Sequence, residues 1–523
     1  MTADTRAGGR RGAAGRGVPW ADVALSSVAS VSWALAAMAG AAALGLHLLG
    51  AGSVGEPGPM TAAVVVLGAG GTVSPSGDVS AFGLDGAAAH TALDVTPLGV
   101  GLVGALALSL FFLRSLRGTG ADLSWGELGA RTGAVAALFV AMVGGLAWAG
   151  HDVVTIDGGR LPGGGDNGAG GLPDGLGDLG GLLPDRLADL SRAEARVGFA
   201  VDTGASLAGG ACWVLGVLVI ALLASRAPLP GRAGRLHRMM RPAVSALVSV
   251  LLVAVLAGCA AAAYAAVGDA HPKRIAGAAL LGAPNGAWLG VPLGLFVPWD
   301  GTATGALSGL LPDPFDELLR GSAEQPVTVG ALAELDGRVW LLAVAAGVMM
   351  LYAGVLAAAR TPRAPGGSAT GFAVRCGLRL GGVTALALPL LVWLTQVSAD
   401  ASLSVLGFDA FGGGIELHGR AGVAAALGAA WGAGAGAAGA LLAWSVGALP
   451  PPLPGGGHPG GEGAGPYRPS RPYRAANPDT NPYLRLPDGV HGAPTVVGRI
   501  GPPVPPPPGP GPGAPPEEPP GHG

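Results

Sequence analysis

Residues 206–225 read SLAGGACWVLGVLVIALLAS, residues 226–242 read RAPLPGRAGRLHRMMRP, and residues 243–268 read AVSALVSVLLVAVLAGCAAAAYAAVG. The first and third segments are apolar, and each reaches the roughly 20 residues that a helix needs to cross a bilayer. Short basic loops stay on the cytoplasmic side of a membrane. The stretch therefore predicts two spans joined by a cytoplasmic loop. The orientation signal consists of Arg226, Arg232, Arg235, Arg238 and Arg241.

The composition of the 523 residues agrees with a membrane protein. Hydrophobic residues make up 50% of the chain and charged residues only 12%, and the mean hydropathy is +0.51. Soluble domains carry about 25% charged residues. The net charge of −3 provides no basic surface for a nucleic acid, so none is expected as a partner. The three cysteines are far apart, which argues against a disulfide framework or a zinc site.

Outward from this stretch, the hydropathy pattern predicts an all-α polytopic membrane protein with about eight transmembrane helices. Acidic and basic loops alternate between them, which predicts a multi-pass protein with both termini in the cytoplasm. The predicted spans are 23–49, 97–113, 132–150, 206–225, 243–268, 339–359, 380–397 and 421–449.

The spans divide the chain into two membrane halves. A disordered basic N-terminus (1–22) precedes the first four-helix half (23–225), and a basic cytoplasmic linker (226–242) leads into the second half (243–449). Residues 450–523 are rich in proline and glycine, a composition that cannot bury a core, so they are predicted to form a disordered cytoplasmic tail.

Three segments between the spans are predicted to build a small extracytoplasmic cap, in which short β-strands are allowed. Residues 64–66 (VVV) favour an external strand, because valine is β-branched. Residues 184–199 have the apolar spacing of an amphipathic helix. Residues 275–299 are apolar but interrupted by prolines such as Pro284 and Pro292. A crossing there would invert the charge bias of all later loops, so this segment is predicted to re-enter or cap the membrane.

The two halves resemble each other. The third span of the first half ends in Leu146-Ala147-Trp148, and the third span of the second half ends in Leu391-Val392-Trp393. Four spans per half give both halves the same orientation, as in a parallel 4+4 tandem repeat. The alternative is a chance likeness between spans that are all rich in alanine, leucine and glycine.

Candidate chemistry is sparse. No predicted span carries Asp, Glu, Lys or Arg in its interior, and such residues mark proton relays and ion paths. An enzyme activity is therefore not expected. The weak candidates for metal ligands are predicted near the outer surface, without diagnostic spacing, so no metal or other cofactor is expected. They are His47, His90, His151, Asp152, His271 and His418.

Further candidates concern binding. The similar segments 80–85 (SAFGLD) and 404–409 (SVLGFD) end in Asp85 and Asp409, either outer-cap ligands or residues of a turn. The tail contains proline runs and, around Tyr483, the sequence NPYLR, which suit a cytoplasmic partner or a plain solvated tail. Gly428, Gly432 and Gly436 repeat the GxxxG spacing, which permits packing inside the bundle or dimerisation, so the oligomeric state stays open.

Several short segments carry a family resemblance. They are SVASVSW (27–33), AFGLD (81–85), LDVTPLG (93–99) and NPYLR (481–485), together with the arginine-rich N-terminus. With them the chain resembles the streptophobe family, hydrophobic multi-spanning membrane proteins of Streptomyces, an actinobacterium. The resemblance implies a multi-pass protein of a bacterial plasma membrane without an assigned activity, and it carries over no functional residue.

Three functions fit these observations. The favoured one is a non-enzymatic membrane scaffold or binding protein, for which a packed bundle with a sealed interior would be the structural sign. The first alternative is a permease for a neutral or apolar solute, which would need a deep cavity between the halves. The weaker alternative is a membrane enzyme with a site in its outer loops.

Overall fold

The computed structural model describes most of residues 19–448, and these residues all belong to one compact unit, Met1–Gly455. The described ranges are 19–53, 55–78, 87–94, 96–117, 124–149, 152–156, 195–227, 229, 231–304, 326–363, 366–405 and 408–448. The predictions for the basic N-terminus up to residue 18, for residues 184–194 and for the tail around Tyr483 lie outside these ranges.

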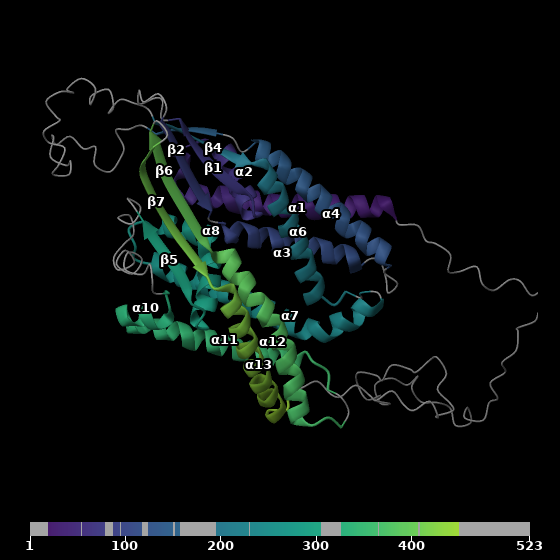
Figure 1. The fold of residues 1–523 in the computed structure, drawn as a ribbon. Coiled ribbons are helices and arrows are strands. Elements are labelled where there is room, and N and C mark those ends of the chain that lie inside the picture. Colours follow the sequence, from purple (N-terminus) through teal and green to yellow (C-terminus); the bar gives the residue numbers. More distant parts are fainter. Residues whose placement is uncertain are drawn as a thin grey trace, which may run out of the picture. The chain divides into compact units, whose positions relative to one another are not determined.

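Within the described ranges, eight helices are long and apolar enough to cross a membrane, in the order that the hydropathy pattern predicts (Figure 1). The fold class, an α-helical protein with eight membrane spans, is therefore confirmed, and the protein is a multi-pass membrane protein. The eight helices are α1 (Trp20–Leu49), α3 (Leu98–Arg117), α4 (Trp125–Ala149), α6 (Thr203–Ala224), α7 (Gly231–Ala266), α11 (Trp340–Ala359), α12 (Ala369–Thr395) and α13 (Ala421–Ser445).

Three helices begin well before the predicted spans. α4 starts at Trp125 instead of residue 132, α7 at Gly231 instead of residue 243, and α12 at Ala369 instead of residue 380. The added turns contain arginines, which are good helix formers and can extend their charged heads to the membrane surface. Several arginines that were predicted in loops are therefore helical. We call the end of the bundle where they gather the arginine end, and the opposite end, from which the strands extend, the sheet end.

The elements follow the same order in both halves. The first half contains α1, α2 (Pro57–Gly68), two strands, α3, α4, two strands and α6. The second half contains α7, α8 (Pro272–Gly294), one described strand, the short helix α10 (Val329–Leu335), α11, α12, two strands and α13. Short 3-10 turns lie at Ala51–Ser53 and Gly337–Val339. This order agrees with the predicted tandem repeat.

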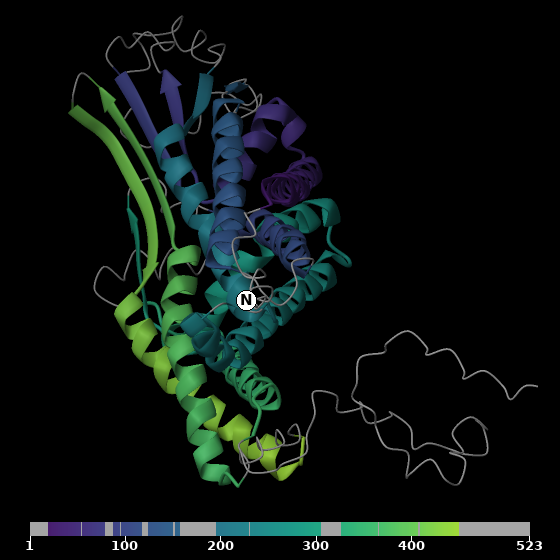
Figure 2. The same cartoon turned by 90° about the vertical axis from the view of Figure 1, so that its right-hand side faces the viewer.

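Seven described strands form one antiparallel sheet in the order β3-β4-β1-β2-β6-β7-β5. Figure 2 shows β6 and β7 continuing from the two green helices of the second half, α12 and α13. The cap thus contains a larger sheet than the predicted short strands suggested. The strands are β1 (Thr72–Asp78), β2 (Ala87–Asp94), β3 (Asp152–Ile156), β4 (Ala195–Asp202), β5 (Trp299–Thr304), β6 (Val397–Val405) and β7 (Phe408–Gly419).

The strand pairing repeats between the halves. In the first half, Thr72 of β1 faces Asp202, the last residue before α6. In the second half, Trp299 of β5 faces Gly419, close to the start of α13. The two half-sheets join where β2 pairs with β6, from Ala87 opposite Val405 to Asp94 opposite Ser398. Each half therefore contributes strands to one continuous surface.

The segment predicted to re-enter or cap the membrane is a helix between the halves. α8 runs unbroken through Pro284 and Pro292, so the prediction that prolines interrupt it is wrong. It is not among the eight spans, and it contacts α1 and α3 of the first half as well as α7, α11 and α12 of the second. Neighbouring helices compensate for the backbone hydrogen bonds that proline removes.

The contacts of α8 join two separate apolar cores. Leu281 packs against the core of the first half, to which Met38 and Phe139 belong. Two turns later, Leu289 packs against the core of the second half. Asn285, between them, bonds to the chain at the start of α3: its Oδ1 accepts from the Leu98 N–H at 3.0 Å, and its Nδ2 donates to the Thr96 carbonyl at 2.7 Å. This amide therefore helps to join α8 to the first half.

Two further local predictions are wrong. Residues 64–66 belong to helix α2, which begins with Pro57 in a position that favours proline. Its buried face includes Ala62 and Val66, and its contacts with α1, α3 and α4 outweigh the strand preference of valine. Residues 195–199, predicted as the end of an amphipathic helix, are part of β4, which pairs with β1 and β3 on its two sides.

Glycines allow the close contact between α12 and α13. A Cβ added at Gly436 would lie 2.9 Å from the Cys376 carbonyl oxygen and from the Gly377 Cα. A Cβ added at Gly432 would lie 2.9 Å from the Gly381 Cα. The GxxxG glycines therefore serve packing inside the bundle, the first of the two interpretations that their spacing allowed.

Candidate functional site

A polar face on β5 and β7 lies where the sheet meets the membrane helices. Side chains alternate along a strand, so residues 300, 302, 416 and 418 share one face. Asp300 faces His418 across the strands, and Thr302 faces Glu416. The opposite face is apolar: Trp299 is buried in the core of the second half. The polar face is defined by Asp300, Thr302, Glu416 and His418, together with Arg420 at the start of α13.

An ion pair organises this face. The Nε of Arg420 donates to Oδ2 of Asp300 at 3.0 Å, and Nη2 donates to Oδ1 at 2.9 Å, so the pair is bidentate. The hydrogen bond from Arg420 holds the pKa of Asp300 below its ordinary value; partial burial opposes this shift, and the charges of Arg420 and His418 add to it. The same hydrogen bond raises the pKa of Arg420. The pair joins β5 to the first turn of α13.

The ion pair predicts a pH dependence of stability. Because the pKa of Asp300 is lower in the folded protein than in the unfolded chain, the pair stabilises the fold at neutral pH. This contribution is lost as the pH falls through the lowered pKa, below about 4. We expect Asp300→Asn to lower the melting temperature slightly at pH 7 and to have a smaller effect near pH 3, where part of this contribution is lost. Thermal unfolding of the purified protein between pH 3 and 7 measures this. Glu416→Gln on the same face is the control, and an equal effect of Asp300→Asn at both pH values would contradict the prediction.

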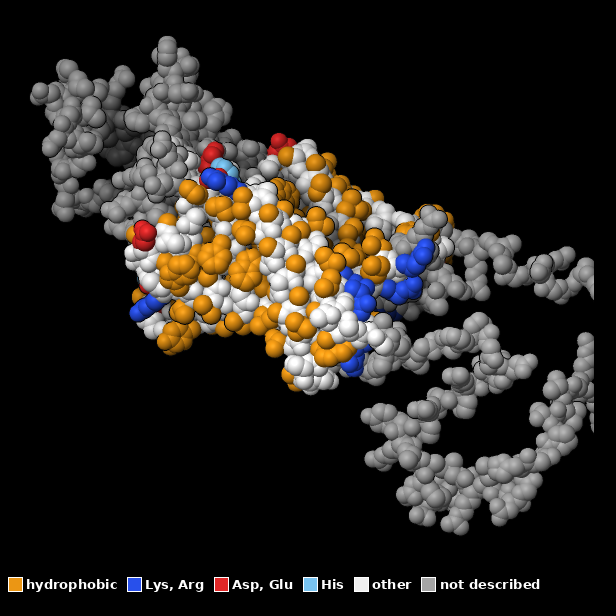
Figure 3. All heavy atoms as spheres, turned by 60° about the horizontal axis from the view of Figure 1, so that its bottom comes forward, with side chains coloured by type: hydrophobic (Ala, Val, Ile, Leu, Met, Phe, Trp, Pro, Cys, Tyr) orange, Lys and Arg blue, Asp and Glu red, His pale blue; other side chains and the backbone are white. Residues whose placement is uncertain are grey.

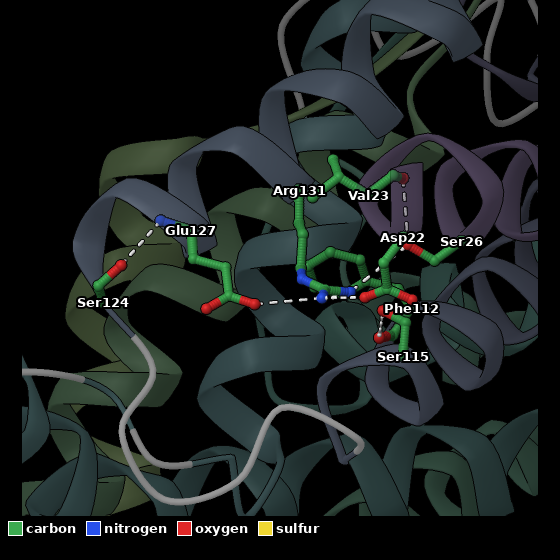
Figure 4. Close-up of polar contacts among 8 residues, drawn as sticks. All are labelled: Asp22, Val23, Ser26, Phe112, Ser115, Ser124, Glu127 and Arg131. Atoms are coloured by element: carbon green, nitrogen blue, oxygen red, sulfur yellow. Dashed lines mark hydrogen bonds and ion pairs between the residues drawn. The ribbon is translucent and has the colours of Figure 1, made fainter. Parts of the chain in front are cut away.

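A charged cluster around a buried arginine lies at the arginine end, between α1 and α4 (Figure 4). The side chain of Arg131 is only 2% exposed. Its Nη2 donates to Oδ2 of Asp22 and, at 3.1 Å, to Oε1 of Glu127. Its Nη1 lies 3.5 Å from Oγ of Ser26, while its Nε is buried without a partner. The cluster thus ties α4 to the first turns of α1.

Sequence reasoning missed this cluster because it placed Arg131 in a loop before the third span. Arg131 instead lies in the second turn of α4, because this helix begins at Trp125 and not at residue 132. Two signals could have revealed it. Glu127 stands four residues before Arg131, a spacing that pairs charges on one helix face, and Ser124 caps the helix by accepting from the Glu127 N–H at 3.1 Å.

The candidate metal ligands are scattered. His47 is exposed in the last turn of α1, and His271 is exposed just before α8, where its backbone N–H donates to Oδ1 of Asp269. His90 in β2 faces Ser76 and Ser402, and Asp152 in β3 faces Phe199. Among these candidates, only His418 is placed opposite a carboxylate, that of Asp300. Within the described ranges, no three His, Cys, Asp or Glu side chains form a group that could hold a metal ion, and His151 lies outside these ranges.

The remaining predicted residues fall into two groups. Asp409 lies near the start of β7, opposite Ser404, whereas Asp85 is outside the described residues. The five arginines of the orientation signal lie at one end: Arg226 precedes α7, and Arg232, Arg235, Arg238 and Arg241 belong to its first turns. Figure 3 shows Lys and Arg side chains gathered towards this end, beside a largely hydrophobic surface.

An open apolar groove of about 450 Å³ lies on α11 and α13 near the sheet end. Phe296, Trp340 and Trp431 line it, with ring centroids 6.3 and 6.5 Å from that of Phe296. Phe296 has φ +68°, and no other described residue except glycine has a positive φ. It occupies the left-handed position after α8 where glycine is usual, and its N–H donates to the Leu293 carbonyl. The strained backbone directs its ring towards the two tryptophans.

Comparisons of the chain with protein-family models, with curated proteins and with solved structures find no match. The functional inference therefore rests on the geometry described above.

Proposed function

We propose that this protein is a non-enzymatic scaffold or binding protein of a bacterial plasma membrane, which displays its sheet at the outer surface. The observation that carries the proposal is the β2–β6 pairing, through which both halves contribute strands to one seven-stranded sheet. A sheet shared by two membrane halves provides one extended surface on a stable base. Movement of the halves against each other would have to break this pairing.

The seam between the halves also favours a static role. α8 fills this seam, with Leu281 in one apolar core and Leu289 in the other. Gly99 of α3 approaches the backbone of α8 so closely that an added Cβ would lie 2.6 Å from the Leu281 carbonyl oxygen. Close backbone contact and interlocked side chains resist sliding. This packing supports a scaffold over a transporter that rocks its halves.

Charge supports the proposed orientation. At the arginine end, Asp22 and Glu127 are the acidic residues that the structure describes, and both bind Arg131. The acidic residues with described side chains at the sheet end include Asp202, Asp300 and Glu416. Under the positive-inside rule these charges support a cytoplasmic arginine end, and with it the predicted cytoplasmic location of both termini. The resemblance to the streptophobe family, and with it an actinobacterial origin, is part of the same proposal.

Cysteine labelling in intact cells tests the orientation. In a variant with Cys212, Cys259 and Cys376 replaced by alanine, Thr302→Cys on the polar face is expected to react with a membrane-impermeant maleimide. Ser124→Cys at the arginine end is expected to react only after the cells are permeabilised. Both positions are exposed, so accessibility to the reagent differs only by side. Labelling of Ser124→Cys in intact cells would reverse the proposed orientation.

The same background separates a scaffold from a permease. Leu281→Cys places a thiol in the seam, where a sealed bundle excludes water. We expect small charged thiol reagents, added to right-side-out vesicles or to inside-out vesicles, to leave position 281 unmodified in both. Thr302→Cys is expected to react in the right-side-out vesicles. A permease that alternates access between its halves would expose position 281 to one side and then to the other, so modification from both sides would refute the scaffold.

The apolar groove supports a second candidate, a permease or carrier for an apolar solute. Its three aromatic rings and its exposed apolar lining suit a hydrophobic molecule that arrives through the bilayer. The groove is lined by α11, α13 and Phe296, which follows the end of α8, and α8 itself occupies the seam. This candidate requires movement of α8, which the Leu281→Cys experiment also detects.

A further inference from the structure

We propose that the arginine end contains a specific binding site for the phosphate of an anionic lipid headgroup, formed by Arg226, Arg241 and Arg360 with Ser245 and Ser249. Arg226 precedes α7, Arg241 and the serines lie on α7, and Arg360 follows the last turn of α11. The site goes beyond an orientation signal, because it has a defined geometry and includes an arginine from another helix.

The serines hold Arg360 in position. Residues 241, 245 and 249 follow one another at four-residue intervals and so form a stripe along one side of α7. Arg360 Nη1 donates to Oγ of Ser245 at 3.1 Å, and Nη2 donates to Oγ of Ser249 at 3.2 Å. The Ser245 hydroxyl donates its hydrogen to the Pro242 carbonyl, and the Ser249 hydroxyl donates its hydrogen to the Ser245 carbonyl. The serine oxygens therefore act as acceptors towards the guanidinium and direct it along the helix.

Within the part of the chain that the structure describes, these three arginines are not paired with a carboxylate. The charges of Arg226 and Arg360 both act on the guanidinium of Arg241, so the like charges are close enough to repel. No carboxylate of the described residues pairs with any of them, and the described acids of this end are bound to Arg131. Nε of Arg241 is buried without a hydrogen-bond partner. An anion with several oxygens would satisfy these donors and remove the repulsion.

The position favours a lipid as the source of the phosphate. Ser249 lies eight residues into α7 from Arg241, about 12 Å along a helix axis. The exposed side chain of Arg360 extends from the end of α11 to Ser249 of α7. Both helices have an apolar surface. A guanidinium at this depth faces lipid headgroups instead of bulk water. Its remaining N–H groups can donate to a phosphodiester at the membrane surface.

Lipid titration of the full-length protein, purified in a neutral detergent, tests the site. We expect phosphatidylglycerol to remain bound in native mass spectrometry and to raise the melting temperature, while phosphatidylcholine does neither. Arg360→Gln and Arg241→Gln are each expected to weaken phosphatidylglycerol binding about ten-fold or more, because each removes charged hydrogen bonds. Arg117→Gln, an exposed arginine at the end of α3, is the matched control and is expected to bind like the wild type.

Two further arms identify the source of the anion and guard against misfolding. Excess inorganic phosphate is expected not to displace phosphatidylglycerol; complete displacement would assign the site to a soluble anion and overturn the proposal. The Ser245→Ala/Ser249→Ala variant keeps all three arginines and is expected to bind several-fold more weakly, because Arg360 loses its support. Equal weakening by Arg117→Gln would show that only the summed charge matters, and wild-type binding by Arg360→Gln would show that Arg360 does not contact the lipid. Either result would refute the site.

Discussion

Replacing Gly432 by leucine is expected to prevent the second half from folding. A Cβ at this position would overlap with Oγ1 of Thr384 and lie 2.9 Å from the Leu380 carbonyl oxygen and from the Gly381 Cα. Two of these three neighbours are backbone atoms, which cannot turn aside as a side chain can. The helices would have to separate along their whole contact. Overpacking a core costs about 1–3 kcal/mol and sometimes more, and here we expect about 3 kcal/mol or more.

The contact between α12 and α13 contains a second element that the leucine would disrupt. Oγ1 of the buried Thr384 donates to its own helix at the Leu380 carbonyl, at 2.8 Å, and lies 2.5 Å from the Gly428 carbonyl of α13. Separation of the helices would leave the Gly428 carbonyl without this contact in an apolar environment. The expected loss of stability therefore combines steric overlap with loss of a polar contact between helices.

Gly434→Leu is the matched control, because Gly434 is exposed two residues further along α13 and a Cβ there has no neighbour within 4 Å. Thermal unfolding in detergent, followed by size-exclusion chromatography, measures both variants. We expect Gly434→Leu to behave like the wild type and Gly432→Leu to elute as an aggregate. A stable Gly432→Leu protein that had only changed from dimer to monomer would instead assign the GxxxG face to dimerisation.

Neutralising both carboxylates of the Arg131 cluster is also expected to destabilise the fold strongly. In the Asp22→Asn/Glu127→Gln variant the amides keep the shape of the carboxylates but not their charge. An arginine guanidinium keeps its charge inside a protein, and here it is 2% exposed. Stranding one partner of a buried pair costs about 3–5 kcal/mol. We expect a loss of this size, measured by thermal unfolding in detergent.

Replacing the arginine instead of the two carboxylates should lower the free energy of unfolding by less. Asp22 is 65% exposed, so it regains water when its partner is removed. Glu127 is 18% exposed and is only partly relieved in this way. We therefore expect Arg131→Met to destabilise by about 1–2 kcal/mol, and the triple variant Arg131→Met/Asp22→Asn/Glu127→Gln to recover much of the loss of the double variant. An Arg131→Met protein less stable than the double variant would contradict this order and make the carboxylates the costly partners.

Local patterns predicted the spans well because a membrane helix satisfies its own backbone and needs only an apolar segment of sufficient length. The eight spans were confirmed on this basis, and their ends were wrong where arginines continue a helix, as at Trp125 and Gly231. The strands were harder to predict. Residues 195–199 have apolar spacing that suits a helix, yet β1 and β3 provide pairing partners on both sides. No local pattern reveals such partners.

The candidate sites also include features that local sequence predicts and features that depend on distant partners. The arginines of residues 226–241 could be predicted from charge alone, because the attraction of a loop to anionic lipid depends only on the number and sign of its charges. Their combination with Arg360 was not predicted, since Arg360 lies more than 100 residues further along the chain and meets Ser245 only in the folded bundle. His418 and Asp300 were likewise brought together by the pairing of β5 with β7.

The sequence by itself determined the solvent, the eight spans and the division into two halves, because each apolar helix is stable in a bilayer through hydrogen bonds within its own segment. The stretch 206–268 already indicated the solvent, because it contains two of the eight spans joined by a basic loop. Only the tertiary structure decided that the half-sheets join through β2 and β6, that α8 fills the seam, and that Arg131 is buried. Each of these depends on partners far apart in the chain, whose contacts form only when the helices pack together.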